Sequence, residues 1–434
     1  MPSEVEGVDC IVTYPTDITA TFERVRGVTC ALAEPLHPED TVVQTMADVS
    51  PTKWHLGHTT WFFETFVLEP HEPNFHPVEP LYRYIFNSYY QQVGPQFHRP
   101  QRGHLSRPTL AEVNHYRRII DERVTRLWHQ AEDDLRATLA SLITVGLHHE
   151  QQHQELLLTD IKHVLAQNPL EPAYADGPTE PILRADPDDS FVSIDGGVFP
   201  VGATEGRFHF DNERPRHEVL LRSFDLARDL VTAADFQAFM AADGFQRPEL
   251  WLSDGWDWLR ATGTRAPLYW YESEDSWYER TLYGPRPVDM GAPVTHVSFY
   301  EADAFARWAG ARLPTEFEWE QAFALRGADA PAGSLMGDGH LHPVGRTREG
   351  EASMLRDMIG EIWEWTASAY LPYPGYRPAP GAIGEYNGKF MSGQMVLRGG
   401  SIATDGDHIR PSYRNFFQPE KQWQFSGIRL ARDP

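Results

Sequence analysis

The chain has 434 residues, of which 41% are hydrophobic and 12% are aromatic, enough for the cores of two or three globular domains. Acidic residues number 62 against 38 lysines and arginines, which gives a formal net charge of −24. Such a charge repels phosphate backbones and anionic membrane surfaces, so we expect neither a nucleic acid nor a membrane partner. The sequence shows no basic leader followed by an apolar segment and no long apolar run, so we expect a cytoplasmic protein.

The chain contains two cysteines, Cys10 and Cys30, both near its N-terminus. Two are too few for a disulfide scaffold or a thiolate metal cluster. A metal site in this protein must therefore use nitrogen and oxygen ligands.

The first part of the chain shows four helical patterns of apolar residues, at residues 18–32, 52–67, 110–127 and 132–165. They predict a four-helix bundle, an architecture that builds metal sites from side chains on facing helices. A long aromatic segment, residues 81–90, lies between the second and third patterns, and a connection of this length is usually functional.

The amino-acid composition changes after the predicted bundle. Residues 168–189 carry five prolines and little periodic apolar content, which predicts a linker between domains. The remainder is rich in glycine and tryptophan, with a predicted strand at residues 191–194 and helices at residues 232–241 and 299–309. We expect an α+β fold with a helical domain at residues 1–167 and an irregular mixed domain at residues 190–434.

Two histidines, His149 and His153, lie four residues apart in the fourth helical pattern. Their rings share one face of the helix, about 6 Å apart along its axis, near enough to bind one metal ion. A histidine pair of this spacing is more often a surface feature or a satisfied core pair. Here the pair continues an apolar stripe through Leu139 and Gly146, which favours two rings inside the bundle.

A catalytic metal usually has three protein ligands and open positions for water or substrate. The second helical pattern contains His55 and His58 among aromatic residues that indicate a buried helix. We prefer His58 as the third ligand, with His55 as a group that could support it. Glu155 lies off the face of His153, so we expect a solvated or supporting carboxylate and not a ligand.

Three neutral imidazoles suit either ferrous iron or zinc, and the residues alone do not separate the two. Ferrous iron would favour an anionic thiolate ligand and could activate O2, whereas zinc would act as a Lewis acid on water or a thiol. No glycine-rich dinucleotide fingerprint follows a predicted strand. We therefore expect the substrates to supply the electrons of any reaction with O2.

Both halves of the sequence resemble known families. Residues 54–64, 87–90 and 149–155 resemble the DinB-like domain of the ergothioneine-biosynthetic sulfoxide synthases, the EgtB family. The C-terminal half is similar to the formylglycine-generating (sulfatase-modifying factor) fold, a C-type-lectin-like domain, at residues 196–199, 213–217, 293–298, 312–320, 360–365 and 397–401. Formylglycine-generating enzymes use cysteines in this domain, and both cysteines here lie before residue 31, which excludes that activity.

The resemblance implies a non-haem Fe(2+) enzyme of ergothioneine biosynthesis. Such an enzyme uses O2 to join cysteine or γ-glutamylcysteine to C2 of hercynine, Nα-trimethylhistidine, and oxidises the sulfur to a sulfoxide. The resemblance places the iron ligands at His58, His149 and His153, and hercynine-binding residues at Gln152 and Asn415. Forming the C–S bond supplies two electrons and sulfoxidation supplies two, which matches one O2.

Two departures from the family pattern bear on the substrates. Members that use γ-glutamylcysteine have two arginines three residues apart, and here Gln96 replaces one while Arg99 remains. Glutamine cannot grip a carboxylate bidentately, so we expect free cysteine as the thiol. Those members also have Trp-Asp where this chain has Phe416 and Phe417, whose rings could contact the trimethylammonium group or pack in the core.

The proton donor is expected to be Tyr89 or Tyr90, whose loop leads from the first iron helix, with structural packing as the alternative role. Some members use a tyrosine from the loop before residues 397–401. That loop here contains Tyr373, Tyr376 and Tyr386, none of them in the family context.

Two other functions remain open at this point. A zinc- or nickel-dependent thiol transferase of the DinB class would use the same histidines without O2. The C-terminal half could instead be a ligand-binding lectin-like module on a structural bundle.

Overall fold

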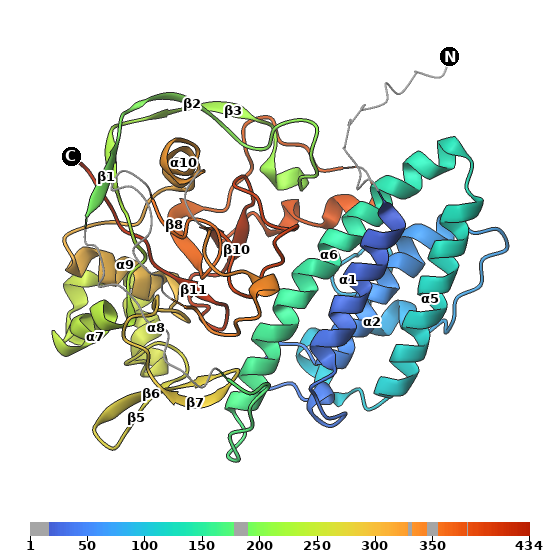
Figure 1. Ribbon diagram of the computed structural model, residues 1–434, viewed down its shortest axis with the longest axis horizontal. Helices are drawn as coiled ribbons and strands as arrows, with labels where there is room; N and C mark the ends of the chain where they lie inside the picture. Colours follow the sequence, from blue (N-terminus) through green and yellow to red (C-terminus); the bar gives the residue numbers. More distant parts are fainter. Residues whose placement is uncertain (1–16, 178–189, 329–331, 345–354, 380) are drawn as a thin grey trace.

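The computed structural model describes residues 17–177, 190–328, 332–344, 355–379 and 381–434. Four long helices lie side by side at one end of the molecule: α1 (Ile18–Ala33), α2 (Thr52–Phe63), α5 (Leu110–Gln130) and α6 (Asp133–Ala166) (Figure 1). They confirm the four predicted helices. The helix predicted at residues 52–67 is α2 followed by the wider π-helical turn η2 (Glu64–Leu68).

Two of the long helices, α1 and α5, begin at residues whose side chains satisfy the first backbone N–H groups. The Asp17 carboxylate accepts from the Ala20 N–H at the start of α1, and Thr109 and Glu112 form a capping box at the start of α5. All twelve residues of α2 are buried, so this helix is the centre of the bundle. The helix tolerates that position because Lys53, His55, His58 and Thr60 have hydrogen-bond partners inside the protein.

Two glycines allow close packing around α2. A Cβ atom at Gly57 would lie 2.2 Å from Cε1 of Phe86, and one at Gly146 would lie 2.6 Å from Cε1 of Phe63. Any larger residue would force neighbouring groups apart. Gly146 thus sets the distance between α6 and α2, which carry the histidines.

The C-terminal half contains small sheets surrounded by short helices. The central sheet has the order β10 (Asn415–Phe417), β9 (Met395–Arg398), β8 (Trp363–Ala369) and β11 (Ser426–Gly427). The other sheets have the orders β1–β4–β12, β2–β3 and β5–β6–β7, from strands β1 (Phe191–Ile194), β2 (Gly197–Val201), β3 (His217–Leu221), β4 (Phe224–Ala227), β5 (Trp270–Ser273), β6 (Ser276–Thr281), β7 (Gly284–Pro287) and β12 (Ala431–Arg432). In the central sheet Leu397 of β9 lies opposite Trp365 on one side and Asn415 on the other.

The expected strand at residues 191–194 is β1, and the two expected helices are α7 (Ala233–Ala241) and α9 (Phe299–Trp308). The sequence reading missed α8 (Ser253–Thr262) and α10 (Glu316–Ala322). Shorter helical segments are α3 (Glu69–His71), α4 (Tyr82–Ile85), and the turns η1 (Asp40–Val42) and η3 (Arg99–His104). None of the described helices is long and apolar enough to cross a membrane.

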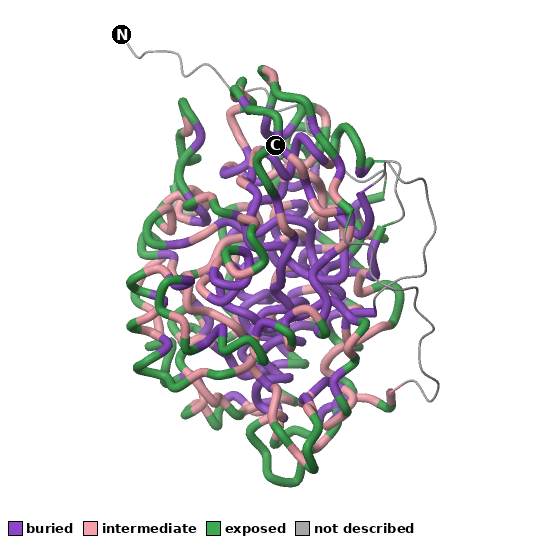
Figure 2. Tube along the Cα trace, turned by 90° about the vertical axis from the view of Figure 1, so that its left-hand side faces the viewer, coloured by how far each residue is buried: buried purple, intermediate pink, exposed green. Residues whose placement is uncertain are grey.

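Helix α6 is the bundle helix that packs against the C-terminal domain (Figure 1). Its Glu155 is buried and accepts hydrogen bonds from Trp363 Nε1 at 2.6 Å, Ser401 Oγ at 2.7 Å and Thr404 Oγ1 at 2.8 Å. Glu155 is therefore not a solvated carboxylate, and one of the two expected roles is wrong. Figure 2 shows that the buried part of the chain runs through the middle of the molecule.

An ion network holds α6 against the other helices. Glu150 is fully buried and pairs with Arg26 and Arg117, each at 2.8 Å. Burial alone would raise the pKa of Glu150, but the two guanidinium groups lower it to about 2. Removing one partner of such a buried pair would leave an uncompensated charge, so the network fixes the rotation of α6 about its axis.

Part of the expected linker lies outside the described residues, since positions 178–189 are not described. Cys10 also falls outside them, and Cys30 is a free, exposed thiol.

Candidate metal centre

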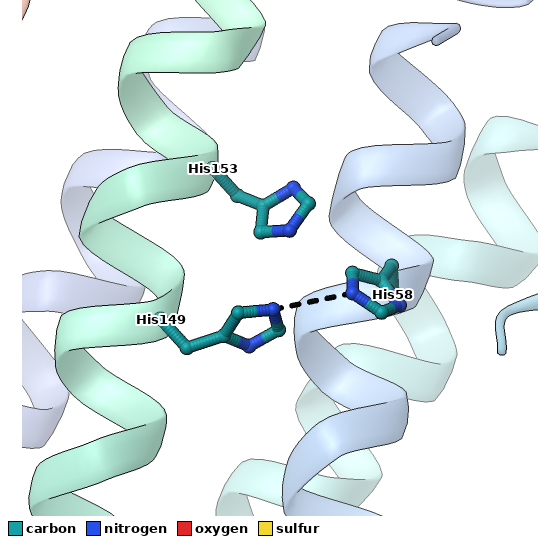
Figure 3. A group of neighbouring side chains, drawn as sticks. All are labelled: His58, His149 and His153. Atoms are coloured by element: carbon teal, nitrogen blue, oxygen red, sulfur yellow. Dashed lines mark hydrogen bonds between the residues drawn. The ribbon is translucent and has the colours of Figure 1, made fainter. Parts of the chain in front are cut away.

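Three histidines meet inside the bundle, His58 from α2 and His149 and His153 from α6 (Figure 3). Each offers one ligand atom, and these atoms lie within 4.8 Å of one another. All three side chains are buried. The structure therefore brings together the three residues predicted as ligands, in an arrangement that could bind a metal ion.

Hydrogen bonds assign the ring protons of His58. Its Nδ1 lies 2.6 Å from the carbonyl oxygen of Phe86, so Nδ1 carries the proton and donates. Its Nε2 then presents a lone pair toward Nε2 of His149, 3.2 Å away. Two ring nitrogens that converge in this way could both bind one cation, as the histidine ligands of a metal do.

Burial keeps the three imidazoles neutral, the form that binds metals. It lowers the pKa of His149 to about 3. It also lowers the pKa of His58 and of His153 well below 6.5, and the neighbouring imidazoles lower both further. The site therefore has ligands ready for a cation without first losing protons at neutral pH.

Aromatic rings form the walls of the site. Trp54 stacks on the His58 ring at 4.5 Å and 13°, and Trp61 stacks on its other side at 5.4 Å and 15°. Phe62 lies 4.8 Å from the ring of His149. These walls restrict the orientation of the imidazoles and surround them with apolar surface.

Gln152, one residue before His153, connects the bundle to the C-terminal domain. Its Nε2 donates to the Tyr413 hydroxyl at 2.5 Å, and its Oε1 accepts from the Tyr386 hydroxyl. Two partners thus fix both ends of the amide group. Asn415 follows Tyr413 by two residues at the start of β10, and its Oδ1 accepts from the backbone N–H of Phe416 at 2.9 Å.

Comparison with known proteins agrees with this two-part architecture. The DinB superfamily matches residues 21–157, and the sulfatase-modifying factor enzyme 1-like domain matches residues 180–434. The hercynine oxygenase of Mycolicibacterium thermoresistibile is 31% identical, over 89% of this chain and 88% of its own. The hercynine oxygenases of Mycobacterium tuberculosis and Mycolicibacterium smegmatis are 30% and 36% identical, over 97% and 70% of this chain and 100% and 73% of their own.

The chain belongs to the hercynine oxygenase family. This confirms the resemblance found in the sequence and the expected fold class, a helical DinB domain followed by a sulfatase-modifying-factor domain. The buried histidine triad brings together the three ligands that the family resemblance implied, in an arrangement that could bind a metal ion.

In this hercynine oxygenase homologue, Tyr386 lies near the triad, although the sequence favoured Tyr89 or Tyr90 as the proton donor. Its ring lies 5.6 Å from that of His149, and burial raises the pKa of its hydroxyl well above 10. The signal available in the sequence was its place in the loop before residues 397–401. Tyr386 is 234 residues from Gln152 along the chain, so local sequence patterns did not show the contact between these two residues.

The two tyrosines predicted as proton donors lie one layer further from the triad. The Tyr90 ring lies 5.6 Å from that of Trp61, and its buried hydroxyl interacts with that of Tyr89. Tyr89 stacks on Tyr90 at 4.7 Å and meets Phe390 of the C-terminal domain at 5.2 Å. A catalytic role for Tyr89 or Tyr90 stays a prediction.

The predicted thiol-binding residues lie in and beside the segment η3. Arg99 is exposed and donates to the Asp48 carbonyl oxygen at 2.5 Å. Gln96 is half-buried, and its Oε1 is a buried acceptor that no described residue satisfies. A buried oxygen without a protein partner could accept a hydrogen bond from a bound ligand.

The paired phenylalanines have aromatic neighbours in their own domain. Phe416 stacks on Tyr370 at 4.0 Å, and Phe417 meets Trp423 edge-on at 5.3 Å. Both rings are half-buried. Their contact with a trimethylammonium group stays a prediction.

Proposed function

We propose that this protein is an Fe(2+)- and O2-dependent sulfoxide synthase that joins the sulfur of cysteine to C2 of the hercynine imidazole. The observation that carries the proposal is the buried triad of neutral imidazoles in a chain of the hercynine oxygenase family. The names of the relatives support hercynine as the substrate and O2 as the oxidant. The product would be hercynylcysteine sulfoxide.

His58, His149 and His153 would hold the metal. When bound, Fe(2+) would supply open positions for the thiolate and O2 and would exchange electrons with them. Three neutral ligands cancel none of its charge, which favours an anionic thiolate over a neutral ligand. Zinc fits the same donors but offers no electron exchange, so the oxygenase family favours iron.

The reaction balances without a separate reductant. The C2–H bond of hercynine and the S–H bond of cysteine break, and a C–S bond and a sulfoxide S–O bond form. One oxygen atom of O2 enters the sulfoxide, and the other leaves as water with the two released hydrogens. The four electrons that reduce O2 therefore come from the two organic substrates.

The side chains around the triad would orient hercynine and transfer protons. The hydroxyls of Tyr386 and Tyr413 hold the amide of Gln152, so its remaining hydrogen-bonding capacity points in a fixed direction before substrate binds. Gln152 and Asn415 would bind hercynine, and Phe416 and Phe417 would face its trimethylammonium group. A phenol from Tyr89, Tyr90 or Tyr386 would donate a proton, since burial keeps each protonated at neutral pH.

The first test measures O2 consumption by anaerobically iron-loaded protein. We expect consumption only when hercynine and cysteine are both present, with a product whose mass includes one added oxygen atom. His149→Ala and His153→Ala should each lose stoichiometric iron and this activity. Turnover without O2 would refute the oxygenase and favour the thiol transferase.

The second test concerns the thiol. Arg99 has no neighbouring arginine at position 96 to complete a carboxylate clamp, so cysteine should outcompete γ-glutamylcysteine in a mixture of both. Gln96→Arg should raise kcat/KM for γ-glutamylcysteine relative to cysteine by about tenfold, roughly one charge-assisted hydrogen bond. The control is Gln101→Arg, which adds the same charge at an exposed position of η3. An equal effect of both substitutions would contradict the role of Gln96.

A further inference from the structure

A chain of buried hydrogen bonds leads from the metal ligand His153 to the C-terminal domain. His153 Nδ1 lies 2.8 Å from Nδ1 of His55, and Nε2 of His55 lies 3.0 Å from Oδ2 of Asp160. Oδ1 of Asp160 accepts from Trp423 Nε1 at 3.0 Å, and Oδ2 also accepts from the Ser50 backbone N–H at 2.7 Å. Each of these five side chains is at most 9% exposed.

The positions of these groups follow from the helices. Asp160 lies seven residues after His153, two turns along the same face of α6. His55 lies three residues before His58 on α2, and Ser50 lies just before that helix begins. Trp423 belongs to the C-terminal domain, so the carboxylate of Asp160 joins three separate parts of the chain.

The partners fix the direction of each hydrogen bond. Asp160 accepts from Trp423 and from Ser50, so the His55 Nε2 that contacts it must carry a proton and donate. Nδ1 of His55, its other ring nitrogen, lies 2.8 Å from Nδ1 of His153 and accepts the hydrogen bond from it when His153 uses Nε2 for the metal. His153 is left with its lone pair on Nε2, the nitrogen free to bind a metal.

We propose that His55, Asp160 and Trp423 are positioning residues that hold His153 in its metal-binding tautomer, so that the C-terminal domain helps to set metal affinity. This inference rests on the proposed metal centre. Outer hydrogen-bond partners of a metal-bound histidine orient its ring, and their loss typically weakens metal binding by about 10- to 100-fold. Without an acceptor at His55, the proton of His153 could move to Nε2 and block the metal.

Two substitutions at one position separate this role from packing. In His55→Asn, the amide oxygen can replace Nδ1 and accept from His153, although the bond to Asp160 is lost. In His55→Gln, the amide reaches the place of Nε2 and keeps the bond to Asp160, but His153 loses its acceptor. We expect His55→Gln to weaken binding of Co(2+) by about 10- to 100-fold, and His55→Asn by much less.

The measurement is Co(2+) affinity by chelator competition on the full-length protein, with the visible absorption of bound Co(2+) as a signature of its coordination. A second pair tests the contribution of the other domain. Trp423→Phe removes the donor to Asp160 and should weaken binding and shift the Co(2+) spectrum. Trp365→Phe, the control, removes a buried donor to the Val297 carbonyl oxygen in the same domain and should leave both unchanged.

We call the chain of hydrogen bonds from His153 through His55 and Asp160 to Trp423 the relay. The outcomes distinguish the relay from the metal centre. If the unmodified protein does not bind one Co(2+) per chain, or if His149→Ala binds it equally well, the metal centre itself is refuted. If the unmodified protein binds Co(2+) but the two His55 variants have equal affinities, the relay is refuted and the metal centre stands. Should the His55 variants not fold, equal affinities of Trp423→Phe and Trp365→Phe would refute the relay instead.

Discussion

Two buried phenols differ in what their hydroxyl groups contact. The Tyr386 hydroxyl donates to Gln152, and its ring lies 5.6 Å from His149. The Tyr90 hydroxyl interacts with that of Tyr89, and its ring lies 5.6 Å from that of Trp61. Burial raises the pKa of both hydroxyls well above 10, so at neutral pH both can donate a proton and neither can accept one as a phenolate.

We expect Tyr386→Phe to lower kcat by about 10²- to 10⁴-fold, the usual contribution of a positioned acid, because its hydroxyl contacts Gln152 and its ring lies beside that of His149. Tyr90→Phe removes a hydroxyl whose contact is with Tyr89 and should change kcat by much less. Both variants should keep full iron occupancy, which is measured first. Product formation in a single turnover then compares them, and a larger loss in Tyr90→Phe would favour the residue predicted from the sequence.

Helix packing sets the distance between the metal ligands. The ring of Phe63 on α2 fits against Gly146 on α6, and His149 follows three residues later. The geometry of the triad therefore depends on the absence of a side chain at one position of the helix interface.

We expect Gly146→Ala to lower the free energy of unfolding by about 1–3 kcal/mol, because its Cβ would lie 2.6 Å from Phe63. It should also weaken metal binding, since α6 must move away from α2. The control is Gly27→Ala on α1, where no atom lies within 4 Å of the new Cβ. That substitution should stabilise by about 0.5–1 kcal/mol through helix propensity. Urea unfolding measures both, and equal shifts of the same sign would contradict the packing argument.

The helices could be predicted from the sequence because their signals are local. Apolar spacing located α1, α2, α5 and α6, and the same spacing placed His149 and His153 on one face. The helices α8 and α10 were missed because they span only ten and seven residues, too few for a long periodic pattern, although a capping box of Thr315 and Glu318 marks the start of α10. The relay through His55 and Asp160 was also invisible, because a hydrogen bond between residues 105 apart has no local pattern.

At the scale of the whole molecule, α6 serves both domains. His149 and His153 face the bundle, while Gln152 and Glu155 contact the C-terminal domain. Sequence spacing placed the first pair correctly, yet it could not say what covers the other side of the helix. One cluster of buried hydrophobic residues contains side chains from both halves of the chain, from Phe22 of α1 to Trp365 of β8, so the two domains share one interior.

Glu155 tests how strongly the domains depend on one another. Glu155→Ala would leave the indole N–H of Trp363 and the hydroxyls of Ser401 and Thr404 without their acceptor. Each of the three buried groups left unpaired costs about 1–3 kcal/mol, so we expect the free energy of unfolding to fall by about 3–9 kcal/mol. The loss should appear in calorimetry as two separated transitions, because the domain contact weakens more than either core. Glu122→Ala, on the exposed face of α5, removes a carboxylate without these partners and should keep the transition of the unmodified protein. If both variants unfold alike, Glu155 does not join the domains, and the energy of the contact must lie in the apolar surface around it.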